Sequence, residues 1–458
     1  MAPSQSYEVT VVGGGLGGLT TALALRQRGL RVTVLEQAAE LGEAGAGIQT
    51  APNASRVLMG LGLRPQMEAI HTEPLDQVRR RWKDGRIVGL TSLGQRCKDQ
   101  FNAPYWHYHR ADLHRVLLDA CVDPAGPGPV VDVHTASKVV ELDRTDPERP
   151  VAVTEDGRRY AGDVLVGADG IRSRTRDLMG APDTLLFSGE MAYRALIPGE
   201  LIAADPATRW LVDRFQSTIW YGPDRHLVHY MIRGGEYLNV VACVPCTDEV
   251  AEKWSVSATA QDLVDAFPGW DDRVPAMLSK AKEDVSAFAL HHRRRDPVWT
   301  DGRVALLGDA CHAMLPYQAQ GASQAMEDAA VLAEELGAVT SAGVEGALVA
   351  RSWPRWPRRE QELRARWLAS CDTEAVTATH RGFESEDFFD WWPSVPGPTA
   401  LLYGADSPVV TAEGAAEAAR LLPSAASVEI PEAGHMLFWD NPAGALAALR
   451  QVLRPMLV

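Results

Sequence analysis

Near the start of the chain, two short apolar runs flank a segment whose apolar residues have helical spacing. Glu8–Val12 is rich in β-branched residues and predicts a buried strand. Residues 16–28 follow with helical spacing, and Gly29 stands where such a helix would end. Arg31–Leu35 predicts a second strand, which ends on Glu36. This order of strand, turn, helix and strand predicts a nucleotide-binding unit with a parallel sheet.

The turn of this unit has the glycine spacing GxGxxG. Gly13 permits a tight turn, Gly15 lets the backbone approach a pyrophosphate, and Gly18 lets the helix pack against the sheet. The free N–H groups of the helix start favour phosphate. Glu36 lies 18 residues after the last glycine and can accept hydrogen bonds from a ribose diol. The pattern predicts a site for an ADP-containing dinucleotide and leaves FAD and NAD both open.

Two later segments repeat the pattern of a buried strand that runs into a turn. Gly162–Val166 leads into Asp169 and Gly170, and Arg303–Leu307 leads into Gly308 and Asp309. Between them, short alternating runs predict an antiparallel sheet with strands at Tyr193–Ile197, Trp210–Phe215, Thr218–Tyr221, Leu227–Ile232 and Tyr237–Val244. Because side chains alternate along a strand, His226 and Tyr230 share one face and His229 points the other way.

Composition narrows the class of protein. A length of 458 residues allows two or three cores, and the net charge of −15 disfavours nucleic acid and anionic membranes as partners. No apolar run is long enough for a membrane span, so we expect a cytoplasmic protein. Cys243 and Cys246 form a lone CxxC after a predicted strand. We interpret them as strand-end cysteines and expect no metal site.

The three glycine-containing motifs occur in the order and spacing of a known family. Over Tyr7–Gly346 the chain resembles the single-component FAD-dependent aromatic hydroxylases with a para-hydroxybenzoate hydroxylase-like fold, and among them the salicylate, 3-hydroxybenzoate and 6-hydroxynicotinate hydroxylases. The resemblance implies an α/β fold: a Rossmann-like FAD-binding domain with an inserted antiparallel-sheet substrate domain. It also implies a reaction in which NADH or NADPH and O₂ hydroxylate a small hydroxy-aromatic acid through a flavin C4a-hydroperoxide. Carbon dioxide leaves as well if the attacked carbon bears the carboxylate.

The resemblance also implies roles for residues around the cofactor. Asp309 would bind the ribityl chain, Pro316 would lie beside the reactive carbon, and the helix opened by Gly321 and Ala322 would face the pyrimidine end of the flavin. Asp169 and Gly170 would support the pyrophosphate side and help NAD(P)H to engage. The other residues implied at the cofactor are Glu36, Gln37, Gly47 and Arg110. A histidine at position 312 is common in the family and is interpreted as structural.

The resemblance further implies that His226 and Tyr230 bind and deprotonate the ring hydroxyl of the substrate, with Gln49 nearby. Histidine suits this task because its unperturbed pKa lies near neutral pH. The 6-hydroxynicotinate enzymes tend to carry histidine where this chain has Gln49 and cysteine where it has Ser217, whereas benzoate-type relatives often have glutamine at the first position. The aromatic acid and the ring position therefore stay open.

The last part of the chain resembles the end of an α/β-hydrolase. A strand at Thr399–Tyr403, a helix over residues 414–422 and a strand at Ser427–Ile430 are predicted, and Asp406 and His435 fall where that family keeps its acid and base. No G-x-S-x-G nucleophile motif occurs in the chain, so we interpret this part as a fusion remnant without hydrolytic activity. Two strands split from a larger sheet would leave unpaired edges, so they must dock on the flavoprotein, pair with another chain or remain poorly ordered; we expect dimerisation, as in a homodimer, or association through this region.

These patterns give a division into domains. We expect a discontinuous FAD-binding domain at residues 1–70, 105–180 and 296–346, with an inserted substrate-binding domain at residues 71–104 and 181–295. A helical linker at residues 347–397 and an α/β-hydrolase-like fragment at residues 398–458 follow. The alternatives are a flavoprotein reductase without oxygenation, a bifunctional oxygenase–hydrolase and an inactive fusion remnant.

Overall fold

A computed structural model gives the fold of most of the chain. It describes residues 7–42, 46–181, 184–247, 254–281, 285–294, 298–339, 344, 400–405, 410–431 and 447–448. Within these residues, no helix is both long enough and apolar enough to cross a bilayer.

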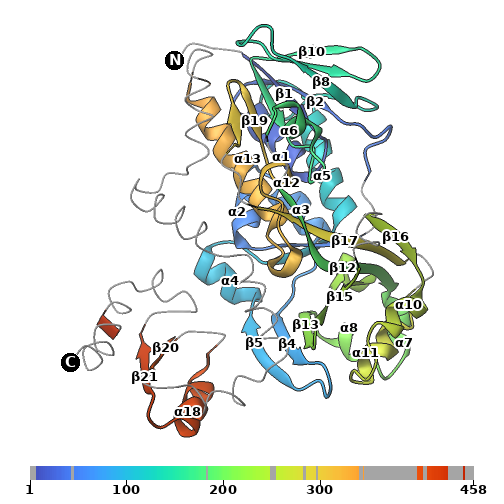
Figure 1. Ribbon diagram of the computed structural model, residues 1–458, viewed down its shortest axis with the longest axis vertical. Coiled ribbons are helices and arrows are strands. Elements are labelled where there is room, and N and C mark those ends of the chain that lie inside the picture. Colours follow the sequence, from blue (N-terminus) through green and yellow to red (C-terminus); the bar gives the residue numbers. More distant parts are fainter. Residues whose placement is uncertain are drawn as a thin grey trace.

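A six-stranded sheet in the order β18–β19–β11–β1–β2–β7 forms the centre of the first domain (Figure 1). Its strands are β1 (Glu8–Val12), β2 (Arg31–Leu35), β7 (Asp132–His134), β11 (Val164–Gly167), β18 (Thr300–Asp301) and β19 (Val304–Leu306). All neighbours pair in parallel except β18 and β19. The predicted bounds of β1 and β2 are confirmed, and β11 and β19 confirm the strands predicted before the two later motifs.

Helices cover one face of this sheet and a smaller sheet covers the other. The helical layer buries one large apolar core; its helices are α1 (Leu16–Gln27), α2 (Pro52–Gly60), α3 (Arg64–Ile70), α5 (Arg110–Val122) and α13 (Gly321–Gly337). The opposite layer is built from β8 (Val139–Asp143), β9 (Val151–Thr154), β10 (Arg159–Ala161), α6 (Arg174–Leu178) and α12 (Asp309–His312). Gly29 adopts a positive φ of +85° directly after α1, as expected for a glycine that ends a helix.

A second sheet of eight strands has the order β16–β17–β12–β15–β14–β13–β4–β5. Its strands are β4 (Asp76–Arg81), β5 (Ile87–Ser92), β12 (Leu185–Pro198), β13 (Gln216–Gly222), β14 (Arg225–Ile232), β15 (Tyr237–Pro245), β16 (Ser255–Ala258) and β17 (Val285–Arg293). Neighbours are antiparallel except β13 and β4, which run parallel. The predicted antiparallel sheet is confirmed.

One predicted strand of this sheet is wrong. Within Trp210–Phe215, residues Trp210–Asp213 form the short helix α8. Hydrogen bonds from Arg209 N–H to Asp205 O and from Leu211 N–H to Thr208 O start this turn upstream of the apolar run. With α7 (Gly199–Ala204), α10 (Ala260–Asp265) and α11 (Arg273–Leu278), helix α8 covers one face of the sheet and buries its apolar side chains (Figure 1).

A short two-stranded sheet joins the two domains. Strand β3 (Gly47–Thr50) pairs antiparallel with β6 (Trp106–His109), which runs directly into α5. Helix α4 (Gly94–Phe101) precedes β6 in the chain. This small sheet brings the segment after β2 next to β14 and β15 of the second sheet, because Gly47 N–H donates to the Asn239 side chain at 2.6 Å.

The C-terminal part contains a strand, a helix and a parallel strand. They are β20 (Ala400–Gly404), α18 (Ala412–Leu421) and β21 (Ala426–Ile430), with β20 and β21 paired in parallel. The three elements predicted there are confirmed. Asp406, His435 and the predicted linker over residues 347–397 lie outside the described residues.

Candidate active site

The glycines of the first turn separate into packing positions and one open position. Gly13 has a φ of +108°, and a Cβ there would lie 2.4 Å from the carbonyl oxygen of Ala168. A Cβ on Gly18 would lie 2.0 Å from the Gly13 oxygen, so this helix start tolerates no side chain. Gly15, by contrast, faces open space beside the start of α1. An open glycine at a helix N-terminus is the cradle that a pyrophosphate needs, so these residues fit the expected dinucleotide.

Glu36 ends β2 beside this turn. Its two carboxylate oxygens accept the N–H groups of Gly14 at 2.7 Å and Ala38 at 2.8 Å. These bonds fix the carboxylate at the edge of the turn and leave lone pairs for further donors such as ribose hydroxyls. Gln37 follows it and is exposed.

Asp169 and Gly170 form the turn after β11. The Asp169 carboxylate accepts hydrogen bonds from the Ser173 hydroxyl at 2.5 Å and from the N–H of Thr175 at 2.8 Å. Burial raises its pKa, and these hydrogen bonds oppose the rise. Gly170 has a φ of +76°. The Asp169 side chain therefore fixes the loop that packs against Gly13.

Asp309 and Arg110 come from distant parts of the chain and lie close enough for their charges to interact. The Asp309 side chain is exposed, yet protein surrounds it so closely that burial raises its pKa, against the charges of His312 and Arg110. A Cβ on Gly321 would lie 3.8 Å from Asp309 Oδ1, so the first turn of α13, which includes Ala322, lies beside Asp309.

A half-buried ion pair holds the loop that carries Asp309. His312 Nε2 lies 2.7 Å from Asp328 Oδ2, which also accepts the N–H of Gly308 at 3.0 Å. Burial opposes protonation of His312, but Asp328 raises its pKa to about 11. A protonated His312 cannot accept a proton from a substrate at neutral pH, so its geometry is that of a structural residue. Asp328 was missed from the sequence because nothing marks it among the acids of its helix.

His226 and Tyr230 lie on the face of β14 that is turned toward the first domain. The His226 ring is 5.2 Å from the ring of Tyr317, which belongs to the 3-10 helix η2 (Pro316–Gln318). At the other end, a Cβ on Gly47 would lie 2.8 Å from the Tyr230 ring. Val228, between the two on the same face, is only partly buried. Two segments of the first domain thus approach the two ends of this face of β14. We call the face formed by His226, Val228 and Tyr230 the platform.

The loop around Pro316 is anchored on both sides of its turn. Pro316 is exposed, and the Tyr317 hydroxyl donates to the carboxylate of Glu190 on β12. Leu315 packs on the small cluster of Ala192 and Cys243 from the same sheet face. These contacts hold Pro316 over the sheet at the His226 end.

Gln49 belongs to a polar cluster at the Tyr230 end. Its Oε1 accepts hydrogen bonds from the hydroxyls of Tyr105 at 2.6 Å and Ser217 at 3.4 Å. Burial and Tyr105 raise the pKa of Tyr230, whereas Arg194 and hydrogen bonding by Gln49 lower it. Tyr105 and Asn239 were not predicted, because only the tertiary fold brings their segments to Gly47 and Gln49.

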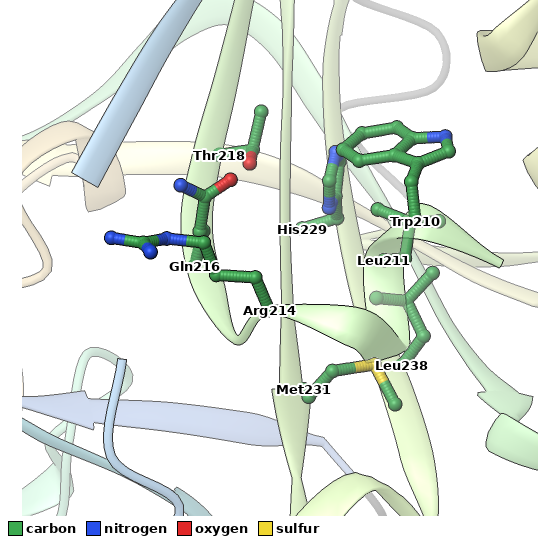
Figure 2. A pocket seen from close by; sticks show the side chains of 8 residues that line it. All are labelled: Trp210, Leu211, Arg214, Gln216, Thr218, His229, Met231 and Leu238. Atoms are coloured by element: carbon green, nitrogen blue, oxygen red, sulfur yellow. The ribbon is translucent and has the colours of Figure 1, made fainter. Parts of the chain in front are cut away.

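His229 lies on the opposite face of the sheet, among the helices. Trp220 Nε1 donates to His229 Nε2 at 3.1 Å, and burial lowers the pKa of His229 to about 3. A shallow hollow on this face, in which His229 lies beside Trp210 (Figure 2), is lined by Trp210, Leu211, Arg214, Gln216, Thr218, His229, Met231 and Leu238. None of these eight residues belongs to the cofactor motifs, so this hollow is separate from the candidate site.

Comparisons with known proteins show the family of the chain. The family model of the FAD binding domain matches residues 6–364, and that of the alpha/beta hydrolase fold matches residues 337–442. Among curated relatives, the 3-hydroxybenzoate 6-hydroxylase 1 of Aquipseudomonas alcaligenes is 37% identical over 334 residues, which cover 72% of this chain and 80% of that protein. The 6-hydroxynicotinate 3-monooxygenase of Pseudomonas fluorescens is 33% identical over 347 residues, which cover 73% and 84%.

A solved structure extends the likeness further along the chain. The substrate complex of a salicylate hydroxylase aligns with a TM-score of 0.63 and 25% identity, over 92% of this chain and 98% of that one.

Proposed function

The chain belongs to the FAD-binding-domain family of flavin-dependent aromatic monooxygenases, and from this premise we propose that it hydroxylates a small hydroxy-aromatic acid of the salicylate, hydroxybenzoate or 6-hydroxynicotinate type, with NADH or NADPH and O₂ as co-substrates. The relatives act on acids of these three types, which share a ring hydroxyl and a carboxylate. Decarboxylation accompanies the reaction where the attacked carbon carries the carboxylate.

One observation carries the proposal: the platform of β14 is approached at both ends by the flavin-binding domain. Gly47 and Gln49 reach Tyr230, and the loop of Pro316 and Tyr317 reaches His226. A ring bound over Val228 would therefore lie between the two candidate polar groups and beside the cofactor loop. Apolar contact with a few convergent polar groups is typical of small-molecule sites.

The cofactor site that we propose follows the three motifs. Bound FAD would accept hydride from NAD(P)H and activate oxygen, which protein side chains cannot do. The residues that would hold it are Gly13, Gly15, Gly18, Glu36, Gln37, Gly47, Arg110, Asp169, Gly170, Asp309, Pro316, Gly321 and Ala322. For Gly47 the close approach to Asn239 and Tyr230 supports a second role, which is to let the cofactor domain contact the substrate sheet.

The protein's own contribution is proton management and exclusion of water. His226 would accept the proton of the ring hydroxyl, because a ring that carries O⁻ is far more nucleophilic than the neutral phenol. Tyr230 would donate a hydrogen bond to that oxygen. The apolar platform and the Pro316 loop would keep water from the reacting carbon.

Turnover with a panel of acids tests this function. The purified chain is loaded with FAD, and oxidation of NADH and NADPH is followed with salicylate, 3-hydroxybenzoate, 4-hydroxybenzoate and 6-hydroxynicotinate. We expect one acid to stimulate oxidation and to yield a product that carries one oxygen-18 atom from labelled O₂. Oxidation without any labelled product would instead favour a reductase.

We also propose that the chain forms a homodimer through its C-terminal part. Within the described residues, β20 and β21 form a sheet of only two strands. Such a sheet has two unpaired edges and is marginal by itself. Light scattering at micromolar concentration should give twice the mass of 49.8 kDa; a mass equal to that of one chain would contradict the proposal.

A further inference from the structure

One row of residues on the platform side of the eight-stranded sheet is partly exposed. Within β14 and β15, both fully described, Val228 and Val241 are the only interior residues that are not buried. These two valines are cross-strand partners, and Val241 also partners Arg194 on β12, which is partly exposed as well. Because direct cross-strand partners point to the same side of a sheet, all three side chains lie on the platform side. We call these three residues the middle row.

Buried side chains border the middle row on both sides. His226 and its cross-strand partner Cys243 form one border. Tyr230 and its partner Asn239 form the other. A flat ring that lies on the two valines therefore has His226 and Tyr230 at its β14 end and Arg194 at its β12 end.

Arg194 supplies positive charge at the β12 end of the middle row. Its guanidinium carbon lies 5.1 Å from the centroid of the Phe288 ring on β17. Phe288 partners Ala192, two residues before Arg194, so the guanidinium lies on the platform side. Burial raises the pKa of Tyr230 and the charge of Arg194 lowers it, so the field of Arg194 reaches β14. A planar guanidinium matches a carboxylate, which it can hold through two parallel hydrogen bonds.

A second arginine lies in the same row on the other side of Val228. Arg79 on β4 partners Ile219 on β13, which partners Val228. Its guanidinium donates to the Thr91 hydroxyl on the edge strand β5 at 3.1 Å and to the Gln77 side chain at 2.8 Å. Ile219, which separates it from Val228, is buried. Arg79 is therefore directed to the edge of the sheet and serves as a matched control for Arg194.

Resting on the proposed function, we propose that Arg194 binds the carboxylate of the aromatic acid and thereby directs the ring hydroxyl toward His226 and Tyr230. The ring lies on Val228 and Val241, with its two polar groups toward different strands. The chain has a net charge of −15, which disfavours anions in general, so a local cation is needed to bind an acid.

Binding of an acid and of its neutral amide measures the contribution of the carboxylate. The FAD-loaded chain is titrated calorimetrically with 3-hydroxybenzoate and 3-hydroxybenzamide, and with 6-hydroxynicotinate and 6-hydroxynicotinamide. We expect Arg194→Gln to weaken binding of the acids by about tenfold to hundredfold, as for the loss of a charged hydrogen-bond partner, and binding of the amides by less than about threefold. Arg194→Lys keeps the charge but not the planar fork, so it should weaken the acids less than Arg194→Gln does.

Two controls separate this contact from general charge and from misfolding. Arg79→Gln removes a cation from the same row and should leave the affinity for the acids unchanged. Circular dichroism and FAD content confirm that each variant is folded. The comparison of acid with amide in the wild-type chain needs no variant, and there the acid should bind more tightly.

The outcomes separate this inference from the proposed function. Equal binding of acid and amide by the wild-type chain, an equal loss of both in Arg194→Gln, or a selective loss of the acid in Arg79→Gln would each overturn the role of Arg194. If the acids bind through Arg194 but yield no product labelled from ¹⁸O₂, the proposed function fails and the carboxylate contact stands. If Arg194→Gln forms labelled product with an unchanged KM, the contact fails and the function stands. If neither acid binds, both fail.

Discussion

Strand β14 carries two histidines three residues apart, and the two faces of its sheet give them opposite properties. His226 faces the flavin-binding domain, where its ring approaches Tyr317. His229 faces the helical layer, accepts a hydrogen bond from Trp220 and is held neutral by a pKa of about 3 (Figure 2). Both are almost fully buried, so burial does not distinguish them.

What distinguishes them is the surrounding structure. The face of His229 is covered by α7, α8, α10 and α11, and there His229 lies beside Trp210 and Trp220. The face of His226 is met by segments of the flavin-binding domain, η2 at His226 and β3 at Tyr230, with the partly exposed Val228 between them. Because His226 lies beside the segments that carry the cofactor motifs, it is the candidate for chemistry, and His229 is not.

The largest expected effect comes from removing the imidazole on the flavin-facing side. His226→Asn should lower kcat/KM for the hydroxylated product by a hundredfold or more, since a general base contributes about 10²–10⁴-fold. FAD content and thermal stability should change little. Turnover within twofold of the wild type would remove His226 from the mechanism.

The matched change on the other face should affect folding instead. His229→Asn removes the acceptor for Trp220 Nε1 and leaves a small void in a filled core, at a cost of about 3 kcal/mol in the free energy of unfolding. Product formation per folded molecule should stay within twofold of the wild type. Urea unfolding and turnover at 15 °C measure the two quantities separately.

Low pH should destabilise the folded protein through the histidines that are buried in the neutral form. Burial lowers the pKa values of His229 and His107 to about 3 in the folded protein. The unfolded chain titrates them near 6.5, so it binds protons that the folded chain does not. Their contribution is complete above about pH 6.5 and is lost as pH falls toward 3, by up to about 1.4 kcal/mol per pH unit for each histidine. Denaturation curves from pH 7 to pH 4 should therefore be less steep in pH for His229→Asn than for the wild type.

A smaller effect is expected where the two domains touch. Gly47→Ala places a Cβ 2.5 Å from Asn239 Cγ and 2.8 Å from the Tyr230 ring, so the contact must open. Displacement of a binding group by a fraction of an ångström should lower the yield of product per NADH by about tenfold while FAD still binds. Gly60→Ala is the matched control, because nothing lies within 4 Å of the added Cβ there. Equal yields in the two variants would show that the contact at Gly47 has no part in the reaction.

The sequence predicted most of the fold, because its strands and turns are locally encoded. The GxGxxG turn fixed the first strand, helix and strand, and the alternation around residues 226–230 gave the correct faces of β14. The prediction failed at Trp210–Asp213, where a turn begun upstream overrides a strand-like run. Part of the candidate site could not be predicted from the sequence. Tyr105 and Asn239 meet Gln49 and Gly47 only after three separate segments pack together, and no local pattern records that.

The central claim is that a ligand binds on the His226 face of β14 and not on the His229 face. It is tested most directly by NMR of the FAD-loaded chain with ¹⁵N-labelled histidine, in which the variants His226→Asn and His229→Asn assign two of the 12 histidines. On addition of the aromatic acid that best stimulates NADH oxidation, we predict that the ring nitrogens of His226 shift and those of His229 do not. A shift of His229 with His226 unchanged would contradict the account and move the site to the helical face.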